Sequence, residues 1–302
     1  MKEKVKITIK FLVVVMVFYA FLIYNIFNIG EKLVPIEKDY VNIDIAETNQ
    51  AAKPDTNAPQ GTGHFVAYDS GNLVDLCNSI GICEKINFKG TFTDTEKYTY
   101  ISIFDRVIQF IHNNSTGSKQ IEDVIHDIEI NKENGDRRGY ATRDSIIFNI
   151  GSVQSKKEFT DLSSHEMGHV TDLGYVQGIS PKKDKNYTEF GKVVFSIDDI
   201  SLGFYKLSRN KETVRKPEAK KKDFCSGYGM SDPFEDFAEC FNLYINHNSF
   251  FKQSAKINPI LRKKYNIIAS IFSGKYIGAN TQDLVYIKTN TSRRPRDTTK
   301  IN

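Results

Sequence analysis

The residues best suited to chemistry in this chain form the sequence His165-Glu166-Met167-Gly168-His169. Two histidines four positions apart lie on one face of a helix, one turn apart, so their imidazoles can converge on one metal ion. Three protein ligands leave the fourth position of a zinc ion open for water. The metal lowers the pKa of that water towards about 7, and Glu166 is in place as the general base. The spacing therefore predicts zinc-dependent hydrolysis; the alternative is a helix with two partly buried, hydrogen-bonded histidines.

The surrounding sequence predicts the helix that this spacing requires. Ser155 and Glu158 have the spacing of a capping box, with Ser155 as the N-cap. Apolar residues follow at intervals of three and four, and Gly174 is a C-terminal stop signal. We expect a helix over residues 156–173, with the two histidines in its second half.

A second helix is predicted within residues 225–246, where Asp232 is a suitable N-cap and Pro233 takes the first helical position. Glu235 and Glu239 are four positions apart and share one face of this helix. A glutamate on a second helix supplies the third ligand in many zinc sites. From position alone, Glu235 could instead complete a capping box with Asp232, and Glu239 could lie on a solvated face. Position therefore leaves the choice between the two glutamates open.

The two segments together resemble the catalytic domain shared by anthrax lethal factor and the secreted Pro-Pro endopeptidases. The family pattern is HExGH, then a Tyr seven residues before E-x-F-A-E-x-F; here Tyr228 precedes such a sequence at 235–241. The resemblance covers residues 159–174 and 225–245, and extends more loosely over 64–275. It implies an α+β fold, a gluzincin-like zinc metallopeptidase domain with a small mixed sheet and active-site helices.

The resemblance also implies a role for six residues, position by position. The residues that correspond to the ligands of one zinc ion per chain are His165, His169 and Glu235. Glu166 corresponds to the general base, and Glu239 to a carboxylate that orients a histidine ligand. Tyr228 corresponds to a tyrosine whose hydroxyl stabilises the tetrahedral oxyanion. The alternative for Tyr228 is a core tyrosine in a glycine-rich loop.

The chain departs from the family pattern in one respect. Glu235 follows His165 by 70 positions, which is more than the family leads us to expect. The additional length falls in residues 175–224, and we expect it to form a lid or an insertion that contacts substrate. Its basic loop, 211–222, is either solvated or placed to attract acidic surfaces. A strand predicted over 140–150, with its own turn at Arg143-Asp144, lies directly before the zinc helix. It is either an ordinary sheet strand or binds an extended substrate at its edge.

The other elements are predicted from periodicity. Residues 98–112 and 259–272 have apolar residues at helical spacing, and 121–131 alternates like a strand. We also expect a short strand over 284–288. The C-terminal residues 289–302 contain several arginines, and we expect a frayed basic tail.

The first 30 residues differ from the rest of the chain. Four lysines precede an apolar run of 19 residues, 11–29. At about 1.5 Å per residue this run spans a hydrocarbon core of about 30 Å. No small-x-small cleavage site follows it, so we expect residues 1–30 to be a cytoplasmic basic stub and an uncleaved signal anchor, with the remainder outside the cell. The alternative is cleavage and secretion. Residues 31–63 include a segment, 44–63, with few apolar side chains, so we expect them to form a flexible linker. We expect the metallopeptidase domain over 64–288.

Four cysteines allow three pairings outside the cell. We favour Cys77 with Cys83 and Cys225 with Cys240, which would tie the Tyr228 loop to the second helix. Cys240 lies about 140° around that helix from Glu235, so it should not face the zinc.

The sequence therefore predicts a membrane-anchored, outward-facing zinc metalloendopeptidase that cleaves a protein or peptide. We call it toxin-like because the family that it resembles includes anthrax lethal factor. A net charge of +4 over 302 residues is too small to predict a nucleic-acid partner. Two other classes fit the same residues: a zinc-stabilised cell-surface binding protein without turnover, and a zinc-dependent cell-wall amidase. The intact Glu166 and Tyr228 argue against the first, and only the resemblance favours a peptide over a wall substrate.

Overall fold

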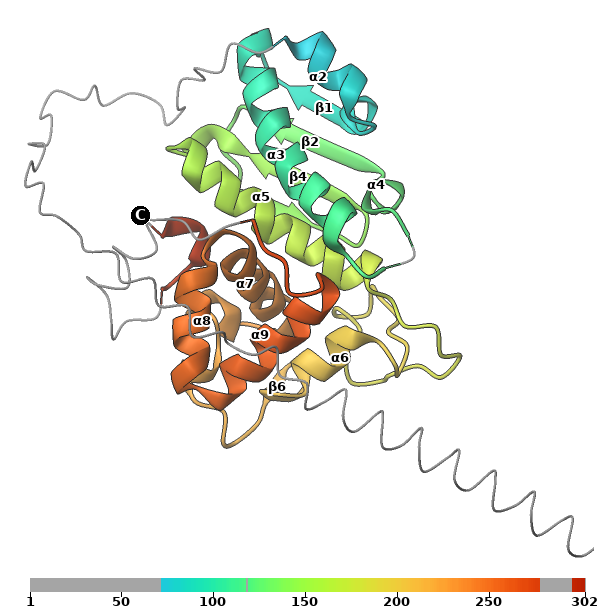
Figure 1. Ribbon diagram of the computed structural model, residues 1–302, viewed down its shortest axis with the longest axis vertical. Helices are drawn as coiled ribbons and strands as arrows, with labels where there is room; N and C mark the ends of the chain where they lie inside the picture. The colour runs from blue at the N-terminus through green and yellow to red at the C-terminus, as the bar shows by residue number, and fades with distance from the viewer. Residues whose placement is uncertain (1–71, 118, 278–294, 302) are drawn as a thin grey trace, which may run out of the picture. The chain divides into compact units, whose positions relative to one another are not determined.

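The computed structural model describes residues 72–117, 119–277 and 295–301 (Figure 1). The predicted signal anchor (1–30), linker (31–63) and short strand (284–288) lie outside these residues. Within the described part of the chain, no helix is both long enough and apolar enough to cross a bilayer. The described residues combine helices with small sheets, which confirms the predicted α+β class.

A four-stranded mixed sheet occupies the N-terminal half of the described chain. In spatial order its strands are β1 (Ile86–Lys89), β2 (Asp127–Asn131), β4 (Ser145–Asn149) and β3 (Gly139–Ala141). The first three strands are parallel, whereas β3 pairs antiparallel with β4 and forms the edge. Alternate residues of the two central strands are fully buried, because successive side chains of a strand point to opposite faces.

The helices form two groups around one central helix. Their bounds are α2 (Leu73–Ser79), α3 (Asp94–Asn114), α4 (Ile121–Val124), α5 (Lys156–Val170), α6 (Ile200–Tyr205), α7 (Pro233–Asn246), α8 (Asn248–Ile257) and α9 (Pro259–Ile271). Helix α5 contacts α3, β3 and β4 on one side and α7 on the other, and Figure 1 shows it between the sheet and the C-terminal helices. A π-helical turn, Thr171–Tyr175, continues α5 two residues beyond the predicted end at 173. Gly174 lies within this turn, so the prediction that it stops the helix is wrong.

Both site helices begin at the predicted N-cap residues. The Ser155 hydroxyl accepts a hydrogen bond from the backbone N–H of Glu158 at 3.0 Å. The carboxylate of Glu158 accepts from Gln154 N–H, one residue earlier than a capping box requires. In α7, Asp232 Oδ1 accepts from the backbone N–H of Phe234 and of Glu235 at 3.0 and 2.8 Å. These bonds satisfy amides that have no partner within their own helix.

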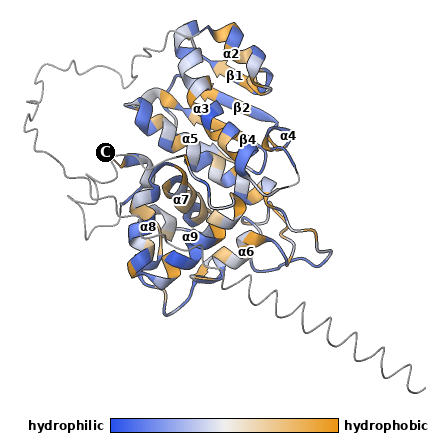
Figure 2. Ribbon diagram, in the orientation of Figure 1, coloured by the Kyte–Doolittle hydropathy of each residue, from blue (hydrophilic) through white to orange (hydrophobic). Residues whose placement is uncertain are grey.

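Close packing of α5 on α7 forms the centre of the core. A Cβ added at Gly168 would lie 2.9 Å from the Cα of Ala238, so the two backbones approach more closely than larger residues allow. Almost every residue of α7 is buried, although polar residues alternate with apolar ones along this helix (Figure 2). The Ser164 hydroxyl accepts from Asn246 at 2.7 Å, and His247 contacts Asp161 at 2.9 Å, which adds polar contacts between the same helices.

Two predicted strands are wrong in their extent. Residues 121–131 do not form one strand, because their first four residues are α4 and β2 begins only at Asp127. Ile121 and Ile125 are both fully buried, and a spacing of four places them on one face of a helical turn rather than of a strand. Residues 140–150 contain most of β3 and all of β4, an antiparallel pair rather than one strand. The predicted turn at Arg143-Asp144 is confirmed, because it lies between the two strands.

The predicted frayed tail is also wrong for residues 295–301. This segment, which we call the C-terminal strap (Pro295–Ile301), contains a 3₁₀ turn at Thr298–Lys300 and contacts both α5 and α7. Thr298 and Ile301 are buried. Arg138 donates to Asp297 Oδ2 at 2.7 Å. The strap is ordered by these partners, none of which is near it in sequence.

Residues 175–224, which the resemblance led us to expect as an insertion and which we call the insertion below, pack on the start of α7. It contains α6 and a short hairpin of β5 (Arg209–Lys211) and β6 (Val214–Arg215). Phe195 stacks on Phe234 with ring centroids 6.1 Å apart, and Tyr205 meets the same ring edge-on at 5.3 Å. The insertion therefore supports the first turn of α7, which carries Glu235.

The two disulfides join Cys77 to Cys83 and Cys225 to Cys240, the pairing favoured from the sequence. The second connects the loop before Tyr228 to α7, across a separation of 15 residues.

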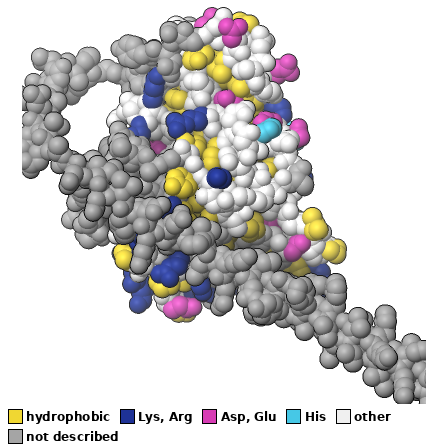
Figure 3. All heavy atoms as spheres, in the orientation of Figure 1, with side chains coloured by type: hydrophobic (Ala, Val, Ile, Leu, Met, Phe, Trp, Pro, Cys, Tyr) yellow, Lys and Arg dark blue, Asp and Glu magenta, His cyan; other side chains and the backbone are white. Residues whose placement is uncertain are grey.

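On the face shown in Figure 3, the described Lys and Arg side chains occur in several separate places among acidic and apolar ones. The described side chains visible on this face therefore show no continuous basic patch.

Candidate metal centre

The two histidines of α5 face one carboxylate oxygen of α7. Nε2 of His165 lies 3.2 Å from Glu235 Oε2, and Nε2 of His169 lies 3.4 Å from the same oxygen. The ligand atoms of the three residues all lie within 4.8 Å of one another. All three side chains are largely shielded from solvent. The structure thus brings together a group of side chains that could hold a metal ion.

The distances from Glu235 to the two histidines fit ligands of a tetrahedral ion. Two ligands that are each about 2.1 Å from a zinc ion lie about 3.4 Å apart when the coordination is tetrahedral. The two distances to Glu235 Oε2, 3.2 and 3.4 Å, are close to this spacing. Two imidazoles and one carboxylate are also ligands that zinc binds in catalytic sites. The three residues therefore fit a metal ion in both chemistry and spacing.

Glu239 contacts the far side of the His165 ring. Its Oε1 lies 2.9 Å from His165 Nδ1, and the side chain is completely buried. Glu239 therefore does not lie on a solvated helix face. A carboxylate this close to Nδ1 favours a proton on that nitrogen, which leaves Nε2 free to bind a metal. The side chain of Glu235 likewise faces the histidines, while Asp232 alone caps the helix.

The buried carboxyl group of Glu166 lies beside the edge strand β3. Its Oε2 has no hydrogen-bond partner among the described residues. A Cβ added at Gly139 would lie 2.5 Å from the other oxygen, Oε1. Burial raises the pKa of Glu166, although His165 and His169 oppose this shift. A carboxylate with a raised pKa and a free oxygen is suited to accepting a proton.

Tyr228 lies at the mouth of the site, in the 3₁₀ turn Tyr228–Met230. Its hydroxyl donates to Glu235 Oε1 at 2.9 Å, and 41% of the residue is exposed. Tyr228 is therefore not a core tyrosine. Burial of the hydroxyl and the charge of Glu235 raise the pKa of Tyr228 well above its usual value, so it remains a hydrogen-bond donor at neutral pH.

The charges of the three possible ligands are coupled. Burial lowers the pKa of His165, but its contacts with Glu235 and Glu239 outweigh this and raise it well above the usual value. Burial also lowers the pKa of His169, and Glu235 raises it. Burial raises the pKa of Glu235, but the two histidines bring it well below the usual value. The carboxylates thus stabilise positive charge at the position where a metal ion would bind.

A cleft of about 640 Å³ is lined by the three possible ligands and by Glu166 and Tyr228, whereas Glu239 is buried behind it. Its wall includes the edge strand β3, the loop that precedes β3, the start of α7 and part of the insertion. From the insertion, Glu189, Phe190 and Lys192 line the cleft. Glu189 and Phe190 have positive φ angles of 45° and 56°, which non-glycine residues seldom adopt. Glu212 holds this turn by accepting from the N–H groups of Thr188 and Phe190.

Comparisons with protein-family models, curated proteins and solved structures find no match to this chain.

A second group of possible ligand atoms, from Cys225, Asp236 and Cys240, does not form a comparable site. The two cysteines are joined in a disulfide, so neither sulfur is a thiolate. Asp236 is paired with the fully buried ammonium group of Lys264. The sequence expectation that these thiols pair rather than bind metal agrees with this arrangement.

Several residues of the cleft were not found by sequence reasoning. Arg138 donates to Glu158 at 2.6 Å and to Asp297 and Thr299 at 2.7 Å, and it lines the cleft. Gly139 and Phe190 line the cleft as well. None of these residues belongs to a motif, and their partners are distant in sequence. Only the turn signal directly before Arg138 indicated that the chain reverses there.

Proposed function

We propose that this chain is a zinc-dependent metalloendopeptidase of the gluzincin type, related to the catalytic domain of anthrax lethal factor and the Pro-Pro endopeptidases. The observation that carries the proposal is the convergence of His165, His169 and Glu235, with Glu166 and Tyr228 in the same cleft. We further propose that residues 1–30 anchor the chain in the cell membrane with the enzyme domain outside.

A zinc ion held by these three residues supplies Lewis-acid chemistry, lowering the pKa of water and polarising a carbonyl group. Glu166 Oε2 takes a proton from the attacking water and then gives it to the leaving amine. The Tyr228 hydroxyl turns from Glu235 to donate to the oxyanion of the tetrahedral intermediate. Glu239 keeps His165 in the required tautomer throughout.

The edge strand supports a peptide as the substrate. β3 is the terminal strand of the sheet and lies along the cleft beside Glu166. An extended peptide can add to such an edge through backbone hydrogen bonds, which orient it without regard to sequence. Phe190 of the insertion offers an exposed aromatic ring on the same cleft and favours an apolar side chain in the substrate.

The test combines metal content with cleavage of a peptide library by the full chain. We expect one zinc ion in the wild-type chain and in Glu166→Gln, with cleavage lost by about 100-fold or more in the variant. His169→Asn should lose the zinc, whereas His126→Asn, which changes an exposed histidine outside the cleft, should keep both properties.

Other outcomes identify the competing functions. Cleavage of purified cell-wall material but not of peptides would favour the amidase. Zinc in the wild type with no turnover on either substrate would favour the binding protein. A folded wild-type chain that takes up no zinc would show that the histidines and Glu235 form only a buried ion-pair cluster.

A further inference from the structure

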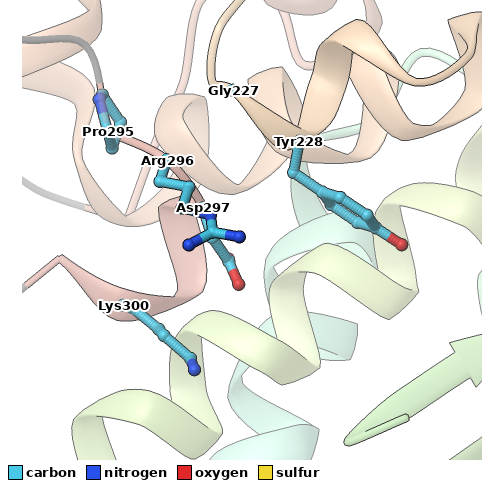
Figure 4. Close-up of a pocket in the computed structure, with 6 residues that line it drawn as sticks. All are labelled: Gly227, Tyr228, Pro295, Arg296, Asp297 and Lys300. Carbon is cyan, nitrogen blue, oxygen red and sulfur yellow. The ribbon is translucent and has the colours of Figure 1, made fainter.

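The C-terminal strap pairs with the loop that carries Tyr228. The backbone N–H of Gly227 donates to the carbonyl of Pro295 at 2.9 Å, and the N–H of Tyr228 donates to that of Arg296 at 2.8 Å. A Cβ added at Gly227 would lie 3.0 Å from the Arg296 carbonyl oxygen, so this close approach favours glycine. Figure 4 shows the strap and Tyr228 lining one pocket, which has a volume of about 770 Å³.

The strap also reaches the metal site through Glu239. The backbone N–H of Thr298 donates to Glu239 Oε2 at 2.9 Å, and the other oxygen of this carboxylate contacts His165 Nδ1 at 2.9 Å. Glu239 thus connects the strap to one of the three possible ligands. Thr298 is fully buried, and its hydroxyl accepts from Asn242 at 3.0 Å. A carboxylate held at both oxygens cannot turn away from the imidazole.

Charged side chains fasten the strap to α5. The guanidinium group of Arg138 donates to Asp297 and Thr299 on the strap and to Glu158 in the first turn of α5. Lys157 donates to the carbonyl of Ile301. These contacts lie on both sides of Thr298. They fix the position of its N–H relative to the helix that carries the histidines.

We propose that the C-terminal strap is a positioning element of the metal site, an inference that rests on the proposed function. The N–H of Thr298 orients Glu239, which orients His165, and the carbonyl of Arg296 fixes the backbone of Tyr228. Outer partners of metal ligands raise metal affinity and activity, commonly by 10- to 100-fold. The strap begins 60 positions after Glu235 and contains none of the three possible ligands, yet its contacts set the geometry of the site.

A matched pair of variants in the full chain isolates the Thr298 N–H. Thr298→Pro removes this donor and the hydroxyl, whereas Thr298→Ala removes only the hydroxyl. Proline suits the position, because Thr298 opens a 3₁₀ turn and the preceding residue, Asp297, is extended with φ −150° and ψ 126°. The measurements are zinc affinity by chelator competition, the visible absorption spectrum of bound Co²⁺, and kcat and KM for a cleaved peptide.

Thr298→Pro should bind zinc about tenfold more weakly than Thr298→Ala, with a changed Co²⁺ spectrum and a lower kcat at similar KM. Equal zinc affinities and spectra in the two variants would overturn the role of the Thr298 N–H. A wild-type chain without zinc would instead overturn the proposed function, and with it the inference. The zinc content of the wild-type chain therefore distinguishes failure of the proposed function from failure of the proposed role of the strap.

A second variant tests the other contact and remains informative if Thr298→Pro does not fold. Gly227→Ala forces the Arg296 carbonyl away from the Tyr228 N–H. We expect kcat to fall while zinc affinity stays unchanged, because Tyr228 is not a ligand. An unchanged kcat in folded Gly227→Ala would overturn the positioning of Tyr228 by the strap.

Discussion

At Gly139, the edge strand of the sheet comes within contact distance of the proposed general base. No side chain larger than hydrogen fits between β3 and Glu166 without moving the carboxylate, because an added Cβ would lie 2.5 Å from Oε1. Glu166 is itself buried, with one oxygen unpartnered among the described residues. The position of one proton acceptor therefore depends on the absence of one methyl group.

Gly139→Ala should lower kcat while zinc content stays at the wild-type level, since none of the three proposed ligands is touched. A displacement of a catalytic group by about 1 Å can reduce the rate by about 100-fold. Steady-state kinetics and metal analysis of the full chain provide the check. Gly81→Ala is the control, because nothing lies within 4 Å of its added Cβ. Equal kcat values in the two variants would contradict this account.

Two helices determine whether the proposed ligands meet. His165 and His169 are brought onto one face by α5 alone, but Glu235 reaches them only because α7 packs closely against α5. Gly168 and Ala238 are small residues that face each other where the two helices approach closely. Gly168 lies within the motif between its two histidines. The residue that allows the helices to approach is thus part of the segment that supplies two ligands.

Gly168→Ala should therefore weaken both the fold and the metal site. The added methyl would lie 2.9 Å from a backbone atom, and overpacking of this kind destabilises by about 1–3 kcal/mol. The matched control is Gly203→Ala in α6, where only a side-chain atom of Ile267 lies near, at 4.0 Å. Because alanine is the better helix former, this control should be neutral or stabilising by up to about 1 kcal/mol.

Urea unfolding and zinc titration of both variants test this expectation. Destabilisation of Gly203→Ala by as much as Gly168→Ala would show that helix contact at Gly168 is not the cause.

At the scale of the whole molecule, three buried groups with raised pKa values make the folded chain less stable as pH rises. The raised pKa values of His165 and His169 mean that the folded chain holds protons more tightly than the unfolded chain. Burial also raises the pKa of Asp172 to about 8, although bonds from Ser201 and Tyr205 oppose the shift. In each case the pKa in the folded chain exceeds the pKa in the unfolded chain. The free energy of unfolding that each group contributes therefore falls as pH rises from its unfolded pKa to its folded pKa.

We therefore expect the chelator-treated full chain to lose stability as pH rises from about 6.5 to about 8. Zinc binds neutral imidazoles, so its stabilising effect should increase over the same range. Thermal unfolding at a series of pH values, with and without zinc, measures both slopes. Asp172→Asn should flatten the slope of the zinc-free chain. A zinc effect that decreases with rising pH would contradict the proposed ligands.

The sequence alone predicted the features that depend on neighbouring residues. The cap at Ser155, the helix with two histidines one turn apart, and the start of α7 at Asp232 each follow from contacts within about four positions. The preferred disulfide between Cys225 and Cys240 also joins nearby segments. Local spacing was misleading over 121–131, where a helical turn and a strand have similar apolar patterns.

Only the tertiary structure decided which distant groups meet. Sequence position left Glu235 free to be a cap and Glu239 free to be solvated, and helix packing placed one beside both histidines and the other behind His165. The same holds for the strap, predicted to be frayed because its residues are basic and terminal. Its order comes from Arg138 and Glu239, more than 50 positions away, and contacts over such separations arise only when the whole chain folds.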